Sequence, residues 1–360
     1  MTETPKETGP SDDGPASFAF DPALLIDVAA EYLLGEEPSL TQAEVAERAG
    51  VDLETAWALW RYLGFAPLDD DRPAFTQADV EAVRITQRLT ELQILDPEVV
   101  PQFVRAMGRT FARLADWQTR LLLTSLTDAT NGEPPLEVLT EVIPMVQEVQ
   151  GSIWRRHLMD RASRLVMQTS SDTTTAPTAV GFVDIVGYTS QSRRLEPRDL
   201  AEMVEWFERV VTELVLDHGG QVIKTIGDEV LYTVDDPIAA ARLALALVER
   251  HDQDERFPEV RVGTAYGPVI ARLGDIFGAT VNLASRLTSI SRPGRVLMDT
   301  ELSQRVREHD EEFRVRRTRR TSVKGYEHLE PWALKRPKVR SSHDRHGRHD
   351  DEQDEDPDDD

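Results

Sequence analysis

The stretch GFVDIVGYT, residues 181–189, constrains the fold more than any other part of the chain. Its first six residues form an apolar run that predicts a short buried strand, and Gly187 ends it. Asp184 stands inside this run, and because a bare carboxylate is costly to bury, it needs a partner, most simply a metal cation. The backbone of Gly187 can turn closely, which suits N–H groups that face an anion. A strand end with an incidental aspartate is the alternative that this stretch alone leaves open.

A second acidic residue lies in a predicted β-hairpin. Two β-rich runs within residues 220–232 flank Gly227-Asp228, and a two-residue turn with glycine first is typical of a type II′ hairpin. A hairpin beside the first strand could bring Asp184 and Asp228 together, where the carboxylates repel each other unless a cation lies between them. Since the chain has no cysteine, the paired aspartates favour a hard, oxygen-bound ion, Mg²⁺ or Mn²⁺.

A third stretch, residues 274–287, combines polar residues with a predicted helix that starts at Thr280. Asn282 and Arg286 are four positions apart, so they share one helical face, and apolar residues can pack on the other side. An amide and a guanidinium on one face suit a sugar and a phosphoryl group.

Together the three stretches resemble the signature of the class III nucleotidyl cyclases, the family of adenylate and guanylate cyclases, over roughly residues 176–335. The resemblance implies a ferredoxin-like α+β catalytic domain and a phosphorus-oxygen lyase that forms a cyclic nucleotide. The order of predicted elements agrees with this fold, because strands alternate with helices and include a hairpin. We expect the helices to cover one side of the sheet.

The resemblance implies two ions, Mg²⁺ or Mn²⁺, in each site, held by Asp184, Asp228 and the backbone carbonyl of Ile185. Backbone N–H groups from Val186 to Tyr188, around Gly187, are expected to cradle phosphates. This agrees with the chemistry of cyclisation, in which the ribose 3′-hydroxyl attacks the α-phosphorus in line while pyrophosphate leaves.

Three further roles follow from the resemblance. Arg286 corresponds to the arginine that neutralises charge on the α-phosphoryl oxygens in the transition state. Asn282 corresponds to the residue that orients the ribose. Lys324 is a candidate for binding the leaving pyrophosphate, and an ordinary surface lysine is the alternative at that position.

The positions that read the base in the family fall on Lys224 and Asp275. Adenine offers an acceptor at N1 and a donor at its amino group, so a lysine donor and an aspartate acceptor match it, whereas guanine presents the reverse pattern. The pair predicts ATP as the substrate. A guanylate cyclase is the alternative within the family.

In the family the two metal aspartates come from one subunit, and the lysine, second aspartate, asparagine and arginine come from the other. This chain carries both sets, which implies a head-to-tail homodimer with two equivalent sites. The segment 270–274 is shorter than in mammalian members, which puts their long dimer-contacting arm in doubt here. The complete set of site residues argues against the alternative of a catalytically inactive cyclase-like scaffold.

The chain divides by pattern into five parts. They are a disordered tail (1–17), an all-helical regulatory domain with a linker helix (18–168), a linker (169–177), the catalytic domain (178–336) and a disordered charged tail (337–360). The helical domain resembles the N-terminal regulatory domain of some actinobacterial adenylate cyclases, including pH-responsive mycobacterial ones. His157 lies in the linker helix, and histidine readily changes charge near neutral pH, so protons are a candidate effector. A solvent-facing histidine with no role is the alternative.

Residues 40–52 also resemble the first half of a helix-turn-helix, which raises the alternative of a DNA-binding regulator with a cyclase-like sensor. The following helix, residues 53–63, offers one arginine and a glutamate among apolar and aromatic residues, and its flanks are acidic. Base readers need Arg, Lys, Asn or Gln at the groove. We therefore expect a protein-facing module, with Trp57 and Trp60 in a core or a dimer contact, and no nucleic-acid partner.

The net charge and the hydropathy of the chain also argue against nucleic-acid and membrane partners. The formal net charge of −24 argues against broad binding of nucleic acids or anionic membranes. No apolar run approaches the ~20 residues that a membrane span needs. The N-terminus lacks the features of a secretory signal, and the lack of cysteine fits a reducing cytoplasm.

Overall fold

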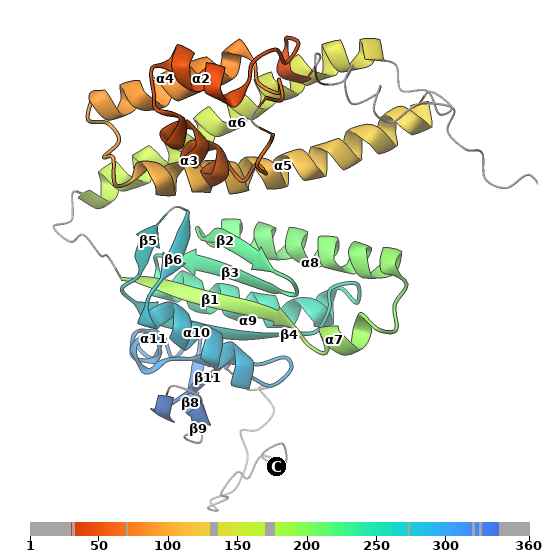
Figure 1. Cartoon of the computed structure of the whole chain (residues 1–360). Coiled ribbons are helices and arrows are strands. Elements are labelled where there is room, and N and C mark those ends of the chain that lie inside the picture. Colours follow the sequence, from red (N-terminus) through yellow and green to blue (C-terminus); the bar gives the residue numbers. More distant parts are fainter. Residues whose placement is uncertain are drawn as a thin grey trace, which may run out of the picture. The chain divides into compact units, whose positions relative to one another are not determined.

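The computed structural model describes residue 30 and residues 33–69, 71–129, 136–169, 177–272, 274–318, 321–323 and 326–337. The chain forms two compact units, Met1–Leu165 and Val166–Asp360, so the division falls inside the long helix α6 (Leu136–Thr169) (Figure 1). The predicted tail 1–17, residues 338–360 of the other tail, residues 170–176 of the linker and Lys324 lie outside the described residues.

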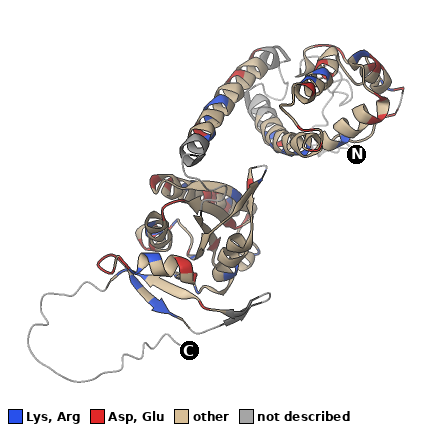
Figure 2. Cartoon of the chain, turned by 90° about the vertical axis from the view of Figure 1, so that its left-hand side faces the viewer, with Lys and Arg blue, Asp and Glu red and all other residues tan. Residues whose placement is uncertain are grey.

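The N-terminal unit is helical, as predicted. Its other helices are α2 (Gln42–Ala49), α3 (Leu53–Leu63), α4 (Gln77–Glu91) and α5 (Val100–Ala129). Thr41 caps α2, because the Glu44 N–H donates to Thr41 Oγ1 at 3.3 Å and the Thr41 N–H donates to Glu44 Oε2 at 2.8 Å. Acidic and basic residues are interspersed along these helices (Figure 2), as on helices with one solvent-facing side.

The helix that follows the helix-turn-helix pattern, α3, packs against α5 within this unit. The guanidinium of Arg105 on α5 lies 4.9 Å from the ring centre of Tyr62 on α3. Trp60 stacks on Phe65 at 4.4 Å and meets the edge of Phe75 at 4.6 Å, so it packs on the core of this unit, which is one of the two placements expected. The helix α3 is therefore held within this unit by its contacts with α2 and α5.

The C-terminal unit is built on a seven-stranded sheet in the order β2-β3-β1-β4-β7-β11-β8. These strands are β1 (Thr178–Ile185), β2 (Gln221–Ile226), β3 (Glu229–Val234), β4 (Val260–Gly267), β7 (Val296–Met298), β8 (Arg314–Arg317) and β11 (Trp332–Lys335). Two short hairpins, β5 (Ile270–Arg272) with β6 (Asp275–Phe277) and β9 (Thr321–Val323) with β10 (Tyr326–Leu329), lie beside it. β4 and β7 run parallel, and the other neighbouring strands are antiparallel.

Helices cover both faces of this sheet, so the expectation of helices on one side only was wrong. The helices are α7 (Tyr188–Gln191), α8 (Pro197–Asp217), α9 (Pro237–Gln253), α10 (Ala279–Ile290) and α11 (Thr300–Val306). Residues of α8, α9 and α11 pack on one face with the odd-numbered residues of β1, and α10 packs on the other face with Val180 and Phe182 (Figure 1). Successive strand residues point to opposite faces, which is why β1 is buried along its whole length.

The α+β class and most element positions agree with the sequence-based expectation. The helix α11 and the hairpin β9–β10 were not predicted. Both are short, and their patterns give weak local signals.

Candidate active site

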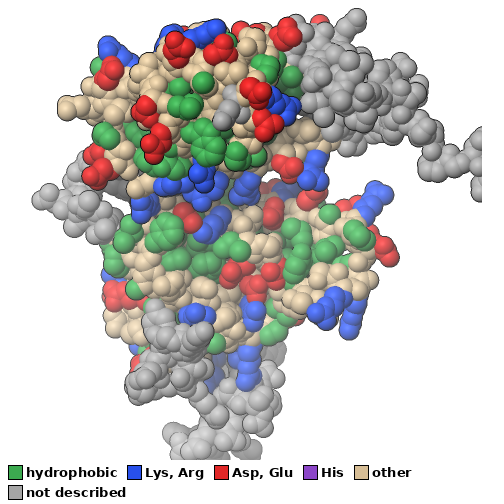
Figure 3. All heavy atoms as spheres, in the orientation of Figure 1, with side chains coloured by type: hydrophobic (Ala, Val, Ile, Leu, Met, Phe, Trp, Pro, Cys, Tyr) green, Lys and Arg blue, Asp and Glu red, His purple; other side chains and the backbone are tan. Residues whose placement is uncertain are grey.

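Asp184 lies at the centre of a row of charged side chains that crosses three strands. Its direct neighbours in the sheet are Glu229 on β3 and Arg261 on β4. Asp184 shares the α10-side face of β1 with Val180 and Phe182, since alternate residues of a strand share a face. We call Glu229, Asp184 and Arg261 the central row. Figure 3 shows acidic side chains gathered on the visible face of this unit, with hydrophobic side chains on either side.

Arg261 supplies a positive charge beside the buried Asp184. Its Nε and Nη2 atoms each lie 2.6 Å from Asp184 Oδ2, and its Nη1 donates to the Ser289 carbonyl of α10 at 3.3 Å. The side chain of Asp184 is therefore held in one position, and the ion pair also ties the sheet to α10. The sequence argument required a cation beside Asp184 but missed Arg261. The alternation Val260-Arg261-Val262, a charge in an apolar strand, was the available signal.

The carboxylates of the site are hard to ionise together. Burial raises the pKa of Asp184, Arg261 opposes this, and Asp228 adds to it. Burial, followed by the charges of Asp184 and Asp228, raises the pKa of Glu229 to about 7. The third carboxylate, Glu229, was also missed from the sequence, although it follows Asp228 directly. The site as a whole favours an added positive charge.

The turn that carries Asp228 is fixed to the end of β1. Gly227 has a φ of 66°, which favours glycine, and Asp228 has a negative φ, the sign pattern of the predicted II′ turn. The Ile185 N–H donates to the carbonyl of Asp228 at 3.2 Å. The hairpin thus brings both aspartates and Ile185 to one end of β1, as the sequence predicted.

Not all of the expected phosphate-binding N–H groups are available. The Val186 N–H donates to the carbonyl of Glu259 at 2.9 Å, so it is already used within the fold. Gly187 follows, and α7 begins at Tyr188. The N–H groups of Gly187 and Tyr188 remain candidates to face an anion.

Lys224 and Asp275 meet although they are 51 residues apart. Lys224 Nζ on β2 lies 2.5 Å from Asp275 Oδ2 on β6, and the Ile276 N–H donates to Asp275 Oδ1 at 2.9 Å. Burial opposes ionisation of Asp275, but hydrogen bonds from Lys224 and the Ile276 N–H outweigh it and lower the pKa of Asp275. The pair presents a donor and an acceptor side by side, both partly exposed.

Asn282 and Arg286 lie exposed on one face of α10, as predicted. Ala284 and Leu287 on the opposite face are fully buried against the sheet. The helix lies close to β4, because an added Cβ on Gly263 would lie 2.1 Å from the Thr288 nitrogen. The position of the exposed pair therefore depends on close contact between α10 and the sheet.

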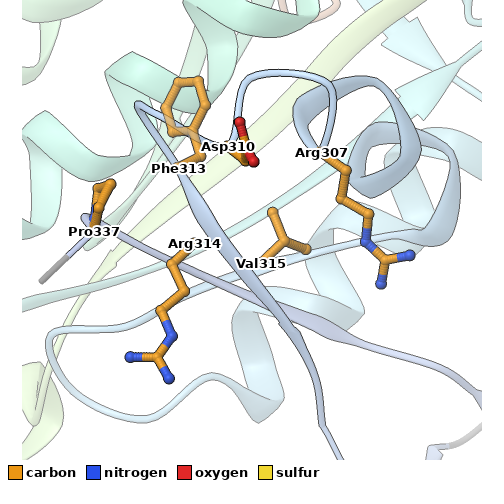
Figure 4. A pocket seen from close by; sticks show the side chains of 6 residues that line it. All are labelled: Arg307, Asp310, Phe313, Arg314, Val315 and Pro337. Atoms are coloured by element: carbon orange, nitrogen blue, oxygen red, sulfur yellow. The ribbon is translucent and has the colours of Figure 1, made fainter.

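The expected residues thus form three groups: Asp184 with Asp228 and Ile185, Lys224 with Asp275, and Asn282 with Arg286. A hollow of about 550 Å³ beside β8 contains none of them. Its lining residues are Arg307, Asp310, Phe313, Arg314, Val315 and Pro337 (Figure 4). Because β8 is the sheet edge opposite β2, this hollow is remote from the candidate site in the strand order.

The donor set of the first group fits a hard divalent ion. Asp184, Asp228 and the Ile185 carbonyl offer only oxygen atoms, the ligands that Mg²⁺ and Mn²⁺ prefer. Within the described residues, no three acidic or histidine side chains converge on a common ion position. Mg²⁺ commonly binds through one or two carboxylates together with substrate phosphates and water, so two aspartates suffice.

The sheet, the oxygen-rich end of β1 and the Asn/Arg helix together have the features of a nucleotide-cyclising enzyme. Residues 171–336 match the adenylate and guanylate cyclase catalytic domain, and residues 17–153 match the adenylate cyclase regulatory domain. The chain belongs to the class III family of adenylate and guanylate cyclases, as its resemblance predicted. Enzymes of this family generally use divalent metal ions.

The relatives that match over most of the chain include three adenylate cyclases. An adenylate cyclase of Streptomyces coelicolor is 43% identical over 279 residues, which covers 76% of this chain and 73% of the relative. One of Glutamicibacter nicotianae is 35% identical over 323 residues, covering 84% and 80%. A pH-sensitive adenylate cyclase of Mycobacterium tuberculosis is 31% identical over 299 residues, covering 78% and 73%. Among the described residues, no helix is both long and apolar enough to cross a membrane.

Proposed function

We propose that this chain is an adenylate cyclase that converts ATP to 3′,5′-cyclic AMP and pyrophosphate. The observation that carries the choice of substrate is the contact between Lys224 and Asp275, which presents the donor and acceptor that adenine requires. The relatives described above, which are named adenylate cyclases, support the same choice. Guanine has the reverse pattern, so its donor would face the Lys224 donor and its acceptor would face the Asp275 carboxylate.

In the proposed reaction the ribose 3′-oxygen forms a bond to the α-phosphorus, loses its proton, and pyrophosphate leaves. Asp184, Asp228 and the Ile185 carbonyl would hold two Mg²⁺ or Mn²⁺ ions, which would supply acidity for the hydroxyl and neutralise phosphate charge. Arg286 compensates charge that develops on the α-phosphoryl oxygens, and Asn282 orients the ribose.

Two further contacts complete the proposed site. The N–H groups of Gly187 and Tyr188 hold phosphate oxygens, and Lys324 remains a candidate for the leaving pyrophosphate.

We also propose that the site is composite, with the metal aspartates of one subunit facing the Lys224, Asp275, Asn282 and Arg286 of a second copy in a head-to-tail homodimer. The exposure of Asn282 and Arg286 supports this arrangement, since both are free to meet another chain.

The base preference is tested by comparing substrates in wild type and Lys224→Ala. Wild type with Mn²⁺ or Mg²⁺ should turn over ATP efficiently and GTP poorly. Lys224→Ala should lower kcat/KM for ATP by about 100-fold, because adenine N1 and Asp275 both lose Lys224 as a hydrogen-bond partner. The value of kcat/KM for GTP should change less. Lys335→Ala, at an exposed lysine of β11, is the matched control and should behave as wild type. Equal or better turnover of GTP by wild type contradicts the assignment.

We propose that residues 18–168 regulate residues 178–336 through α6. A separation of the reacting groups by ~1 Å can lower the rate ~100-fold. A small rotation between subunits is therefore enough to control the catalytic rate. His157 is exposed on α6 and is the candidate proton sensor.

The measurement is the pH–rate profile of the full chain, of residues 169–360 and of His157→Ala. The full chain and the fragment should differ in rate by severalfold or more at some pH, and His157→Ala should flatten the profile toward that of the fragment. Identical rates for chain and fragment at every pH contradict regulation. A profile of His157→Ala that matches the full chain removes only the role of this histidine.

A further inference from the structure

We propose that Glu229 strengthens cation binding at the Asp184–Asp228 end of β1 through its charge, without being one of the ligands. The inference rests on the proposed function, because it takes the two aspartates to be the cation ligands. It adds a residue that determines how tightly this particular chain holds its ion.

The position of Glu229 is the first argument. Glu229 and Asp184 are direct partners on antiparallel strands, and both belong to the α10-side face of the sheet. Directly opposed residues on one face have Cβ atoms about 4.5–5.5 Å apart, and like charges placed so destabilise a sheet. Asp228 precedes Glu229 and adds a third carboxylate. The opposition of two like charges on neighbouring strands costs stability, and such a cost is expected at a functional site.

The charge balance is the second argument. Arg261 is the basic side chain that forms an ion pair with Asp184, and no other ion pair to the three carboxylates occurs within the described residues. Three carboxylates and one guanidinium leave a formal charge of −2, which one divalent ion neutralises. Without Glu229 the formal charge would be −1.

The positions of the three carboxylates argue that Glu229 acts from outside the ligand shell. The side chains of Asp184, Asp228 and Glu229 do not converge on a common ion position. A carboxylate about 7 Å from a divalent ion, screened as in water, still strengthens binding by about tenfold. The number of charges near an oxygen site is a general determinant of its affinity for divalent ions.

The direct test is a calorimetric titration of Mn²⁺ alone into the nucleotide-free full chain. It is made at about pH 8.5, well above the ordinary pKa of carboxyl side chains. Glu229→Gln keeps the shape of the side chain and should weaken Mn²⁺ binding by about tenfold. Glu205→Gln, the same change at an exposed site on α8, should leave the affinity unchanged. Asp184→Asn should lose the binding.

Thermal unfolding supplies a second measurement that does not depend on activity. In EDTA, Glu229→Gln should unfold at a higher temperature than wild type, because the repulsion within the central row is relieved. Saturating wild type with Mn²⁺ should raise its unfolding temperature, and the same Mn²⁺ concentration should raise that of Glu229→Gln by less.

The outcomes separate the two proposals. Wild-type Mn²⁺ affinity in Glu229→Gln, with binding lost in Asp184→Asn, overturns this inference and leaves the proposed function standing. If wild type itself shows no Mn²⁺ binding that depends on Asp184, the cation site is overturned, and this inference with it. A weakened Glu229→Gln that also unfolds earlier than wild type in EDTA points to lost structure and counts against a charge effect.

Discussion

Replacing either Asp184 or Arg286 with alanine is expected to reduce the rate of cyclic AMP formation by about a thousandfold. Asp184→Ala removes a proposed cation ligand and leaves Arg261 without its carboxylate partner. Arg286→Ala removes the charge proposed to stabilise the transition state and leaves the packing of α10 unchanged, because its side chain is exposed. Initial rates with saturating ATP and Mn²⁺ measure both losses.

Mixing the two inactive variants should restore activity if the sites are composite. Random exchange of subunits makes half of the dimers heterodimers, and each heterodimer has one of its two sites intact, so about a quarter of the wild-type rate is expected. The matched control mixes Asp184→Ala with Asp228→Ala. Both defects then lie in the same half of the site, and no recovery should follow. If the first mixture stays inactive while subunits demonstrably exchange, each site belongs to a single chain.

The substitution Gly263→Ala is expected to lower both the stability of the protein and its catalytic rate, because it disturbs the contact of α10 with β4. Its added Cβ would lie 2.1 Å from the Thr288 nitrogen and 2.6 Å from the Leu287 carbonyl carbon, both in the backbone of α10. Since these backbone atoms cannot move away by a change of rotamer, the helix must shift and carry Asn282 and Arg286 with it. We expect a loss of about 1–3 kcal/mol in the free energy of unfolding and of about 100-fold in kcat.

The matched control for this change is Gly151→Ala in α6. There the added carbon would meet only the end of the Arg155 side chain, at 3.4 Å, and alanine favours a helix over glycine. The unfolding temperature of Gly151→Ala should stay at or above the wild-type value. A Gly263→Ala enzyme with wild-type kcat and stability would show that contact between α10 and β4 does not position the site.

Much of the candidate site could be predicted because its signals are local. The turn at Gly227-Asp228 follows from a glycine with positive φ between two β-rich runs, and the shared face of Asn282 and Arg286 follows from the helical period. The strand around Asp184 was recognisable from its apolar run. Each of these depends on residues within a few positions of one another.

Other features involve residues that are distant in the sequence. Arg261 lies 77 residues from Asp184, and only the register of β4 against β1 places its guanidinium on that carboxylate. Glu229 stands beside Asp228 in the sequence, but its opposition to Asp184 comes from the pairing of β3 with β1. The second helical layer was missed for the same reason, because a buried strand is apolar on both sides and does not indicate what covers each face.

By itself the sequence determined the class of fold, the acidic turn, the polar face of the Asn/Arg helix and the family. The tertiary structure alone decided which charge neutralises Asp184, that Lys224 meets Asp275 directly, and that Gly263 sets the distance of α10 from the sheet. The physical reason is that hydrophobic period and turn chemistry act over a few residues, whereas ion pairing and close packing depend on strand register and on the contact between layers.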